Sequence, residues 1–313
     1  MKTLSQVEPR IPITSVPFTI SQAGSYYLVS NLTCSVAGSN GISITTSGVT
    51  LDLCGFSLIG PGGSSGYGIY AGGLNVHIRN GIVRNWYGYD KYGVYITGSA
   101  SSLRDMEIRE CASGAYLAGD AAYILDCQAD TIGNTSLCYG IRTGHGAVVR
   151  NSMCQKVTGG GTAYGISVAE DCMVTGCQAW DVESSTTNGA GIRAFRGGRI
   201  TDCVANYNEV HGLMISDRCL VANNTCIDNG NRGALVGGIN ILGVNNVIQN
   251  NHIARNYYGW DFAASSSNNL LVCNTLMQNT IVADGLSPNN HVGPFDSGSV
   301  MTPTNHPWAN FVF

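Results

Sequence analysis

The chain has 313 residues and a formal net charge of −4, with 12% charged and 44% hydrophobic residues. This apolar content excludes an intrinsically disordered chain, which is poor in aliphatic residues and strongly charged. No run approaches the roughly 18 consecutive apolar residues of a membrane helix. No basic patch of the kind that binds nucleic acid occurs either. We therefore expect a folded protein with no membrane span and no nucleic-acid partner.

The first 40 residues precede a repeat and are expected to form its N-terminal cap, because a solenoid with exposed ends polymerises edge to edge. Tyr26, Tyr27 and Leu28 are predicted to form the first pairing strand. Residues 1–5 lack the apolar core of a signal peptide. The protein is therefore either cytoplasmic or an exported protein whose leader has been replaced. We favour a secreted or extracellular protein, because long β-solenoids with polar, glycine-rich surfaces are commonly exported.

A step of glycine followed by an apolar residue recurs across residues 41–282. Successive glycines lie 21 to 27 residues apart, and apolar residues alternate with polar ones after each of them, as in strands. This spacing predicts one coil of three short strands per unit, and so a solenoid of about ten rungs. The glycines are Gly41, Gly68, Gly93, Gly114, Gly140, Gly165, Gly191, Gly212, Gly238 and Gly259.

A column of cysteine and asparagine is predicted to point inward at the end of the second strand. Stacked asparagines bond from coil to coil, and a reduced cysteine fills the same position as a small hydrophobe. A disulfide between neighbouring coils stays open, because strands about 4.8 Å apart are near the lower limit for bridged Cα atoms. The column is Cys54, Asn80, Met106, Cys127, Asn151, Cys177, Cys203, Asn224, Asn250 and Asn274.

After Val282 the repeat stops, and residues 283–313 contain four of the eight prolines and an apolar end. Such a tail is expected to fold back on the solenoid or to dock on a neighbouring subunit. A homo-oligomer held through the tail or the solenoid edges is therefore an open prediction. No second domain is expected.

Repeats of the form G-I-x-I…V-x-x-C/N, together with the opening Pro17-Phe18-Thr19-Ile20, resemble those of right-handed parallel β-helix proteins, the pectin-lyase-like superfamily. The resemblance covers about residues 17–282. It implies an all-β, single-stranded right-handed parallel β-helix of an exported bacterial type, with a polysaccharide as partner. It matches no specific catalytic family. Gly144-His145-Gly146 matches one short element of polygalacturonase-like hydrolases, but the acidic elements that accompany it there are absent.

Six loops, at residues 60–67, 86–92, 131–139, 157–164, 182–190 and 228–237, come just before a repeat glycine, so they are expected along one edge. They would overhang an outward column that is interpreted as substrate-binding. Aromatic rings stack on sugars, and arginine pairs with carboxylates. The alternative is a tyrosine ladder that only stabilises the sheet. The predicted substrate-binding residues are Tyr70, Tyr95, Tyr116, Arg142, Arg193 and Trp86.

The predicted catalytic residues are ionisable groups near the same edge. Asp181 and Asp228 share one repeat offset two coils apart. This places them about 9.6 Å from each other, at the far edge of the ~6.5–9.5 Å that inverting glycosidases use. Glu209 and His211 lie beside them, and a histidine next to a glutamate suits a general base. The alternative is a set of solvated turn carboxylates. No metal site is predicted and no cofactor is required by the sequence, while calcium stays open.

Two main functions therefore remain open, with binding of a glycan without turnover as a third. One is an extracellular carbohydrate-active protein, a polysaccharide lyase or glycoside hydrolase that acts on an acidic polysaccharide in a loop-lined groove. The other is a non-catalytic structural, adhesive or self-assembling solenoid, which the missing catalytic signatures favour. The sequence does not decide whether the protein is an enzyme.

Overall fold

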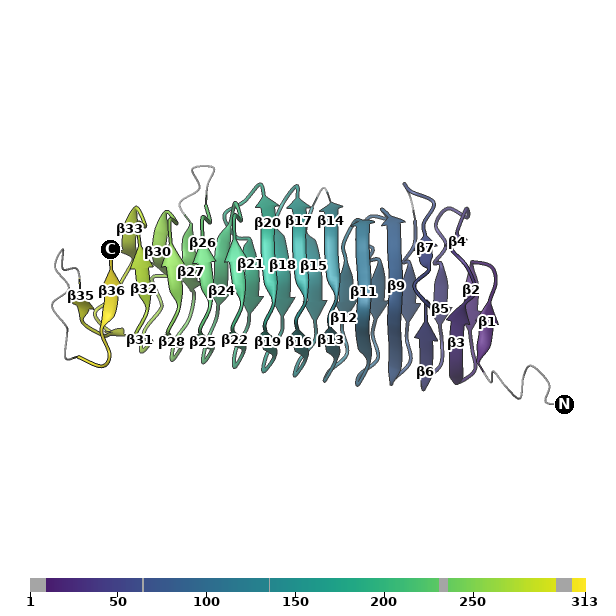
Figure 1. The fold of residues 1–313 in the computed structure, drawn as a ribbon, viewed down its shortest axis with the longest axis horizontal. Helices are drawn as coiled ribbons and strands as arrows, with labels where there is room; N and C mark the ends of the chain where they lie inside the picture. The colour runs from purple at the N-terminus through teal and green to yellow at the C-terminus, as the bar shows by residue number, and fades with distance from the viewer. Residues whose placement is uncertain (1–9, 64, 135, 231–235, 297–305) are drawn as a thin grey trace.

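The computed structural model describes residues 10–63, 65–134, 136–230, 236–296 and 306–313. These residues form a parallel β-solenoid whose coils stack along one axis (Figure 1). All of the described regular structure is β-strand, and the described residues include no helix long and apolar enough to span a membrane. Each coil contributes to three parallel ladders, so the predicted all-β solenoid is confirmed.

The first ladder is a twelve-stranded sheet that contains the glycine-led strands. The ten predicted units each supply one strand, and one further strand is added at either end. The strands are β2 (Phe18–Ile20), β5 (Ile42–Ile44), β8 (Ile69–Ala71), β10 (Val94–Ile96), β12 (Ala115–Leu117), β15 (Cys138–Thr143), β18 (Ala163–Val168), β21 (Ala190–Ala194), β24 (His211–Ile215), β27 (Gly237–Ile241), β30 (Tyr258–Phe262) and β33 (Ile281–Asp284).

The second and third ladders belong to one continuous sheet, because two long strands, β9 (Val76–Trp86) and β11 (Ser102–Cys111), run through both. The second ladder also contains β1 (Ile11–Ile13), β3 (Gly24–Leu28), β6 (Val49–Asp52), β13 (Tyr123–Leu125), β16 (Val148–Arg150), β19 (Met173–Thr175), β22 (Arg199–Thr201), β25 (Leu220–Ala222), β28 (Val247–Gln249), β31 (Leu270–Val272) and β34 (His291–Val292). The third also contains β4 (Leu32–Thr33), β7 (Ser57–Ile59), β14 (Gln128–Asn134), β17 (Met153–Gly159), β20 (Gln178–Ser184), β23 (Val204–Asn206), β26 (Thr225–Ile227), β29 (His252–Ala254), β32 (Thr275–Met277), β35 (Phe295–Asp296) and β36 (Asn310–Val312).

The core is a continuous column of apolar side chains inside the coils. In the first ladder the residue after each repeat glycine points inward, as Ile69 and Val94 do at 0% exposure. Trp86 is packed in the same interior, and a Cβ on Gly41 or Gly68 would lie 2.9 Å or 3.1 Å from its ring. The glycines of these coils are therefore needed so that neighbouring backbone can approach the indole.

The column of cysteine and asparagine that was predicted to point inward at the end of the second strand differs from the prediction at four of its ten positions. Cys54, Asn80, Asn151 and Asn250 have φ of 53°, 60°, 49° and 56°, and they occupy a left-handed turn position instead of the interior. After Asn151 and Asn250 the next residue takes the inward place, so that Ser152 and Asn251 are buried at 1% exposure. Asparagine and aspartate tolerate this φ well, which explains why they recur there.

Asparagines form three hydrogen-bonded ladders in the C-terminal coils, where only one inward column was predicted. In one ladder, which includes the predicted Asn224 and Asn274, each amide nitrogen donates to the side-chain oxygen of the asparagine in the next coil, from Asn224 through Asn251 and Asn274 to Asn310, at 2.9–3.1 Å. A second ladder begins at Asn208 and a third at Asn246. These bonds satisfy buried amides that would otherwise be unpaired.

All twelve cysteines lie in the described residues and are free thiols, ten of them buried. Burial raises the pKa of Cys111, Cys127 and Cys138 to about 12, so these thiols stay protonated and serve as small apolar filler. Cys177 and Cys203 are neighbours in one column, where the backbone N–H of Cys177 lies 3.4 Å from the Cys203 sulfur.

Strands continue the ladders on both sides of the predicted repeat. β3 pairs with both β1 and β6, and β36 pairs with β32 and β35. Residues 1–9 of the predicted cap and 297–305 of the predicted tail lie outside the described residues. The division into a cap (1–40), a solenoid (41–282) and a tail (283–313) stays a prediction.

Candidate functional site

The outer face of the first ladder carries three tyrosines in consecutive coils. Tyr70, Tyr95 and Tyr116 pair in register, as the repeat spacing predicts. Tyr67 and Tyr92, from the position just before the repeat glycine, fill the spaces beside them, and ring centroids lie 5.0–5.9 Å apart. Burial raises the pKa of Tyr92 to about 12. We call these five residues the tyrosine segment; its rings pack mainly on one another.

The next three coils place Arg142, Ser167 and Arg193 at the same outward position. We call these three residues the arginine segment. The Arg142 guanidinium lies 4.4 Å from the Tyr116 ring and 4.6 Å from the Tyr139 ring. Each arginine thus lies over aromatic rings, where cation–π attraction stabilises the guanidinium.

Arg193 is held from two sides. Its guanidinium lies 4.1 Å from the Phe195 ring and 4.9 Å from the Tyr164 ring, and its Nη1 donates to the Tyr164 hydroxyl at 2.8 Å. Since Ser167 is small, the space between the two arginines is not filled by a side chain of its own coil.

A first hollow of about 250 Å³ opens at this point, lined by Tyr116, Tyr139, Arg142, His145, Ser167 and Arg193 among others. His145 is an exposed side chain just beyond β15. The hollow therefore combines two cations with an imidazole and phenol groups. Such a set can bind a carboxylate and move a proton beside it.

A second hollow of about 430 Å³ lies beside the first and shares Tyr139 and Arg193 with it. It is nearer the loop edge, where Leu137, Thr162 and Asn188 overhang the face. Its floor includes Met214 and Leu242. Apart from the shared Arg193, the described residues that line it include no lysine, arginine or carboxylate.

The loops of these coils lie on the predicted edge but are shorter than predicted. The strands β14, β17 and β20 extend to Asn134, Gly159 and Ser184, into the expected loops 131–139, 157–164 and 182–190. The reason is that a left-handed residue in each strand, at Thr131, Lys156 and Asp181, breaks the alternation and turns the next residue inward. The inward residues that follow, Ile132, Val157 and Val182, pair in register. The connections that lead from the third ladder to the next first-ladder strand lie along the upper long side in Figure 1.

His211 lies at the border of the second hollow, with its side chain 5% exposed. The backbone N–H of Gly237 donates to its Nδ1 at 2.9 Å. Asn240 lies 3.2 Å from its Nε2 and donates to Asp261 at 2.7 Å. Burial lowers the pKa of His211 to about 4, so the imidazole is neutral and a weak base near pH 7.

The other predicted catalytic residues lie elsewhere. Asp181 and Asp228 do occupy one turn position two coils apart, with Tyr207 between them. The Asp228 carboxylate accepts two hydrogen bonds from Arg255, at 2.6 and 2.8 Å. Glu209 is half-buried just before β24. None of Asp181, Asp228 and Glu209 lines either hollow.

Trp86, predicted to bind substrate, is fully buried at 0% exposure. It ends β9 directly after the left-handed Asn85 (φ 68°), which breaks the alternation and turns Trp86 inward. Its indole N–H donates to the Leu58 carbonyl at 3.4 Å. No ring face is left for a sugar, so the prediction for Trp86 is wrong. The loop begins one residue later than the sequence suggested.

A column that the sequence reasoning missed lies just before the repeat glycines. Tyr139 and Tyr164 stack there with ring centroids 5.6 Å apart, and both support the arginines. The signal was present, because Tyr67, Tyr92, Tyr139, Tyr164 and Tyr258 each precede a repeat glycine.

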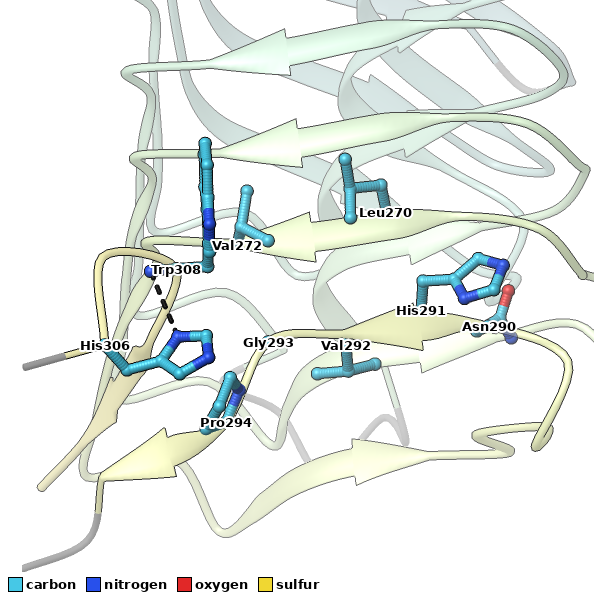
Figure 2. Close-up of a pocket in the computed structure, with 9 residues that line it drawn as sticks. All are labelled: Leu270, Val272, Asn290, His291, Val292, Gly293, Pro294, His306 and Trp308. Carbon is cyan, nitrogen blue, oxygen red and sulfur yellow. Dashed lines mark hydrogen bonds between the residues drawn. The ribbon is translucent and has the colours of Figure 1, made fainter.

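A third hollow of about 580 Å³ lies at the C-terminal end, between β31 and β34 of the second ladder and residues 306–308 (Figure 2). Its lining is mostly apolar and includes Val272, Val292 and Trp308. His291 and His306 lie at opposite ends of it (Figure 2). It contains no predicted site residue and is on a different face from the arginine segment.

The described residues contain no candidate metal centre. Within the described ranges, no three histidine, cysteine, aspartate or glutamate side chains come together as metal ligands.

Several solved structures have the same architecture at low sequence identity. The A-module of a mannuronan C-5 epimerase from Azotobacter vinelandii gives a TM-score of 0.68 at 12% identity, covering 91% of this chain and 90% of that chain. A periplasmic alginate epimerase gives 0.61 at 12% identity, with 97% and 76% covered. A surface adhesin of Streptococcus pneumoniae gives 0.53 at 10% identity, with 87% and 82% covered.

These likenesses show the fold, and the chain is a right-handed parallel β-helix. No protein-family model matches the sequence, and no curated protein matches it.

Proposed function

We propose that this protein acts outside the cytoplasm on an acidic polysaccharide, which lies across the outer face of the first ladder. The observation that carries the proposal is the first hollow, where Arg142 and Arg193 flank the small Ser167 and His145 stands at the rim. A uronate carboxylate fits between two guanidinium groups, because arginine binds carboxylates with paired hydrogen bonds.

The chemistry that suits this hollow is removal of the proton on C5 of the uronate. That C–H bond is adjacent to the carboxylate, so its electron pair is delocalised into the carboxylate when a base takes the proton. Arg142 and Arg193 would stabilise the charge that develops there, and His145 would accept the proton. The carbanion then either expels the C4 oxygen, which is a lyase reaction, or regains a proton on the opposite face, which is an epimerisation.

Two considerations support this proposal over a glycoside hydrolase. A hydrolase of the predicted type needs two carboxylates facing the substrate, but Asp181 and Asp228 line neither hollow, and Asp228 is held by Arg255. Among proteins of like fold, the mannuronan and alginate epimerases are named for action on uronate polymers. The tyrosine segment continues the same face and offers Tyr70, Tyr95 and Tyr116 for stacking of further sugars.

The test is proton exchange at C5. The protein is incubated in D₂O with alginate, polygalacturonate and hyaluronan, and deuterium at C5 is followed by NMR together with absorbance of unsaturated ends. His145→Ala is expected to lower turnover by about 10²–10⁴-fold, the usual contribution of a general acid or base. The matched control is His252→Ala in β29, on the third ladder, which should retain full activity.

A lack of exchange and of unsaturated product on every uronate polymer would refute the catalytic part. Binding of acidic glycans that survives both Arg142→Met and Arg193→Met would refute the assigned surface as well. The structural or adhesive alternative would then gain support, most of all if discrete oligomers form in solution.

A further inference from the structure

The two adjoining hollows differ in chemistry in a way that bears on the order of sugars in the substrate. The first presents Arg142, Arg193 and His145 and suits a carboxylated sugar. The second presents Leu137, Met214 and Leu242, with the amides of Asn188 and Asn240 beside them. It therefore suits an uncharged sugar that bears a small apolar group.

The hollows are placed for neighbouring sugars of one chain. The two hollows adjoin, because Tyr139 and Arg193 line both of them. The first lies toward the ends of the first-ladder strands, where His145 follows β15, and the second lies toward their beginnings, where Tyr164 and His211 precede the repeat glycines. A glycan that occupies both must cross the strands diagonally, from the rim of His145 to the loop edge.

The floor of the second hollow is already an apolar patch before any ligand binds. Met214 packs with Tyr139 and Tyr164 in a small cluster separate from the main core, and Leu242 is partly buried against it. Beyond it, Asn240 donates to the Asp261 carboxylate at 2.7 Å, and Asp284 follows Asp261 in the next coil. A second carboxylated sugar placed there would approach these acidic groups.

We propose that the second hollow binds the acetamido group of an N-acetylhexosamine next to the uronate in the first hollow, so that the substrate is a polymer in which the two sugars alternate. This rests on the proposed function of the first hollow. The acetamido methyl contacts Met214 and Leu242, while the amides of Asn188 and Asn240 offer hydrogen bonds to its polar atoms. Leu137 covers the group from the loop edge.

The experiment compares two hyaluronan oligosaccharides that differ by one methyl group per disaccharide, the natural N-acetyl form and an N-formyl form. Affinity is measured by titration calorimetry, with an alginate oligosaccharide of equal length as the uronate-only probe. The N-acetyl form is expected to bind about fourfold more tightly than the N-formyl form, the value expected when one methyl-sized group leaves water.

The variant that tests the assignment is Leu137→Gln combined with Leu242→Gln, because neither leucine belongs to the main core. It should abolish the preference for the N-acetyl form and leave alginate binding unchanged. Leu74→Gln, at a leucine 53% exposed on another part of the surface, is the matched control and should keep the preference. Circular dichroism checks that each variant is folded.

The outcomes separate the two proposals. Equal binding of the N-acetyl and N-formyl forms, with alginate bound, would overturn the acetamido subsite and leave the uronate hollow standing. A preference that persists in the folded double variant would overturn it too. Failure of every acidic oligosaccharide to bind would refute the proposed function and the acetamido subsite with it.

Discussion

The tyrosine segment and the arginine segment occupy the same outward position of the same ladder, yet only one of them is hollowed. In the first, large rings fill the surface and lie 5.0–5.9 Å from each other. In the second, Ser167 stands between two arginines and a hollow of about 250 Å³ remains. The backbone register is the same in both segments. The small size of the Ser167 side chain therefore decides whether this face is closed or open to a ligand.

The largest effect on ligand binding is expected from a substitution that removes this difference between the two segments. Ser167→Tyr should continue the tyrosine column into the arginine segment and fill the first hollow. Uronate binding should fall by a hundredfold or more, since hydrogen bonds to charged groups contribute about 1.5–3 kcal/mol each and two arginines lose theirs. Titration with alginate oligosaccharides measures the loss. Unchanged affinity in a folded Ser167→Tyr protein would mean that the acidic sugar binds elsewhere.

A second effect concerns the column just before the repeat glycines, where His211 follows Tyr139 and Tyr164. Burial lowers the pKa of His211 to about 4 from its ordinary 6.5. The unfolded chain takes up this proton below about pH 6.5, whereas the folded chain does so only near pH 4. Stability should therefore fall as the pH drops between these values, by about 3 kcal/mol in all.

Chemical denaturation of the wild type and of His211→Asn between pH 7 and 4 measures this contribution. The variant cannot take up the proton, so its stability should depend less on pH over that range. Parallel curves for the two proteins would show that His211 is not the group responsible.

The smallest effect is expected in the tyrosine segment. Tyr95→Ser removes a ring that contacts Tyr67, Tyr70 and Tyr116. The free energy of unfolding should fall by at least the value of one ring pair, about 0.5–1.5 kcal/mol. Affinity should drop for long acidic oligosaccharides and stay constant for short ones that reach only the arginine segment. An equal drop for both lengths would place Tyr95 in the primary site.

Sequence reasoning reached the fold and the register because the glycine step repeats the same local chemistry in every coil. Tyr70, Tyr95, Arg142 and Arg193 fell into one column for this reason. The errors arose where a coil gains or shifts a single residue. A left-handed residue moves the inward place to the next residue, from Asn151 to Ser152 and from Asn85 to Trp86.

The hollows could not be predicted from the sequence, because they depend on the space that the side chains of neighbouring coils leave unfilled. Ser167 is unremarkable alone and matters only between Arg142 and Arg193. The Tyr139 and Tyr164 column was visible in the spacing, but its role under the guanidinium groups required the stacked structure. The predicted catalytic role of Asp181 and Asp228 rested on their shared repeat offset. The offset is correct, but it places both residues at an edge away from the hollows.

The asparagine ladders give the C-terminal coils a lengthwise polarity. Each side-chain amide of Asn224, Asn251 and Asn274 donates one hydrogen bond to the asparagine of the next coil, toward the C-terminus, and another to a backbone carbonyl of the preceding coil. Amides aligned head to tail polarise one another, so each bond strengthens the next. The C-terminal coils thus carry rows of amide dipoles that point the same way along the solenoid axis, although the coils themselves repeat.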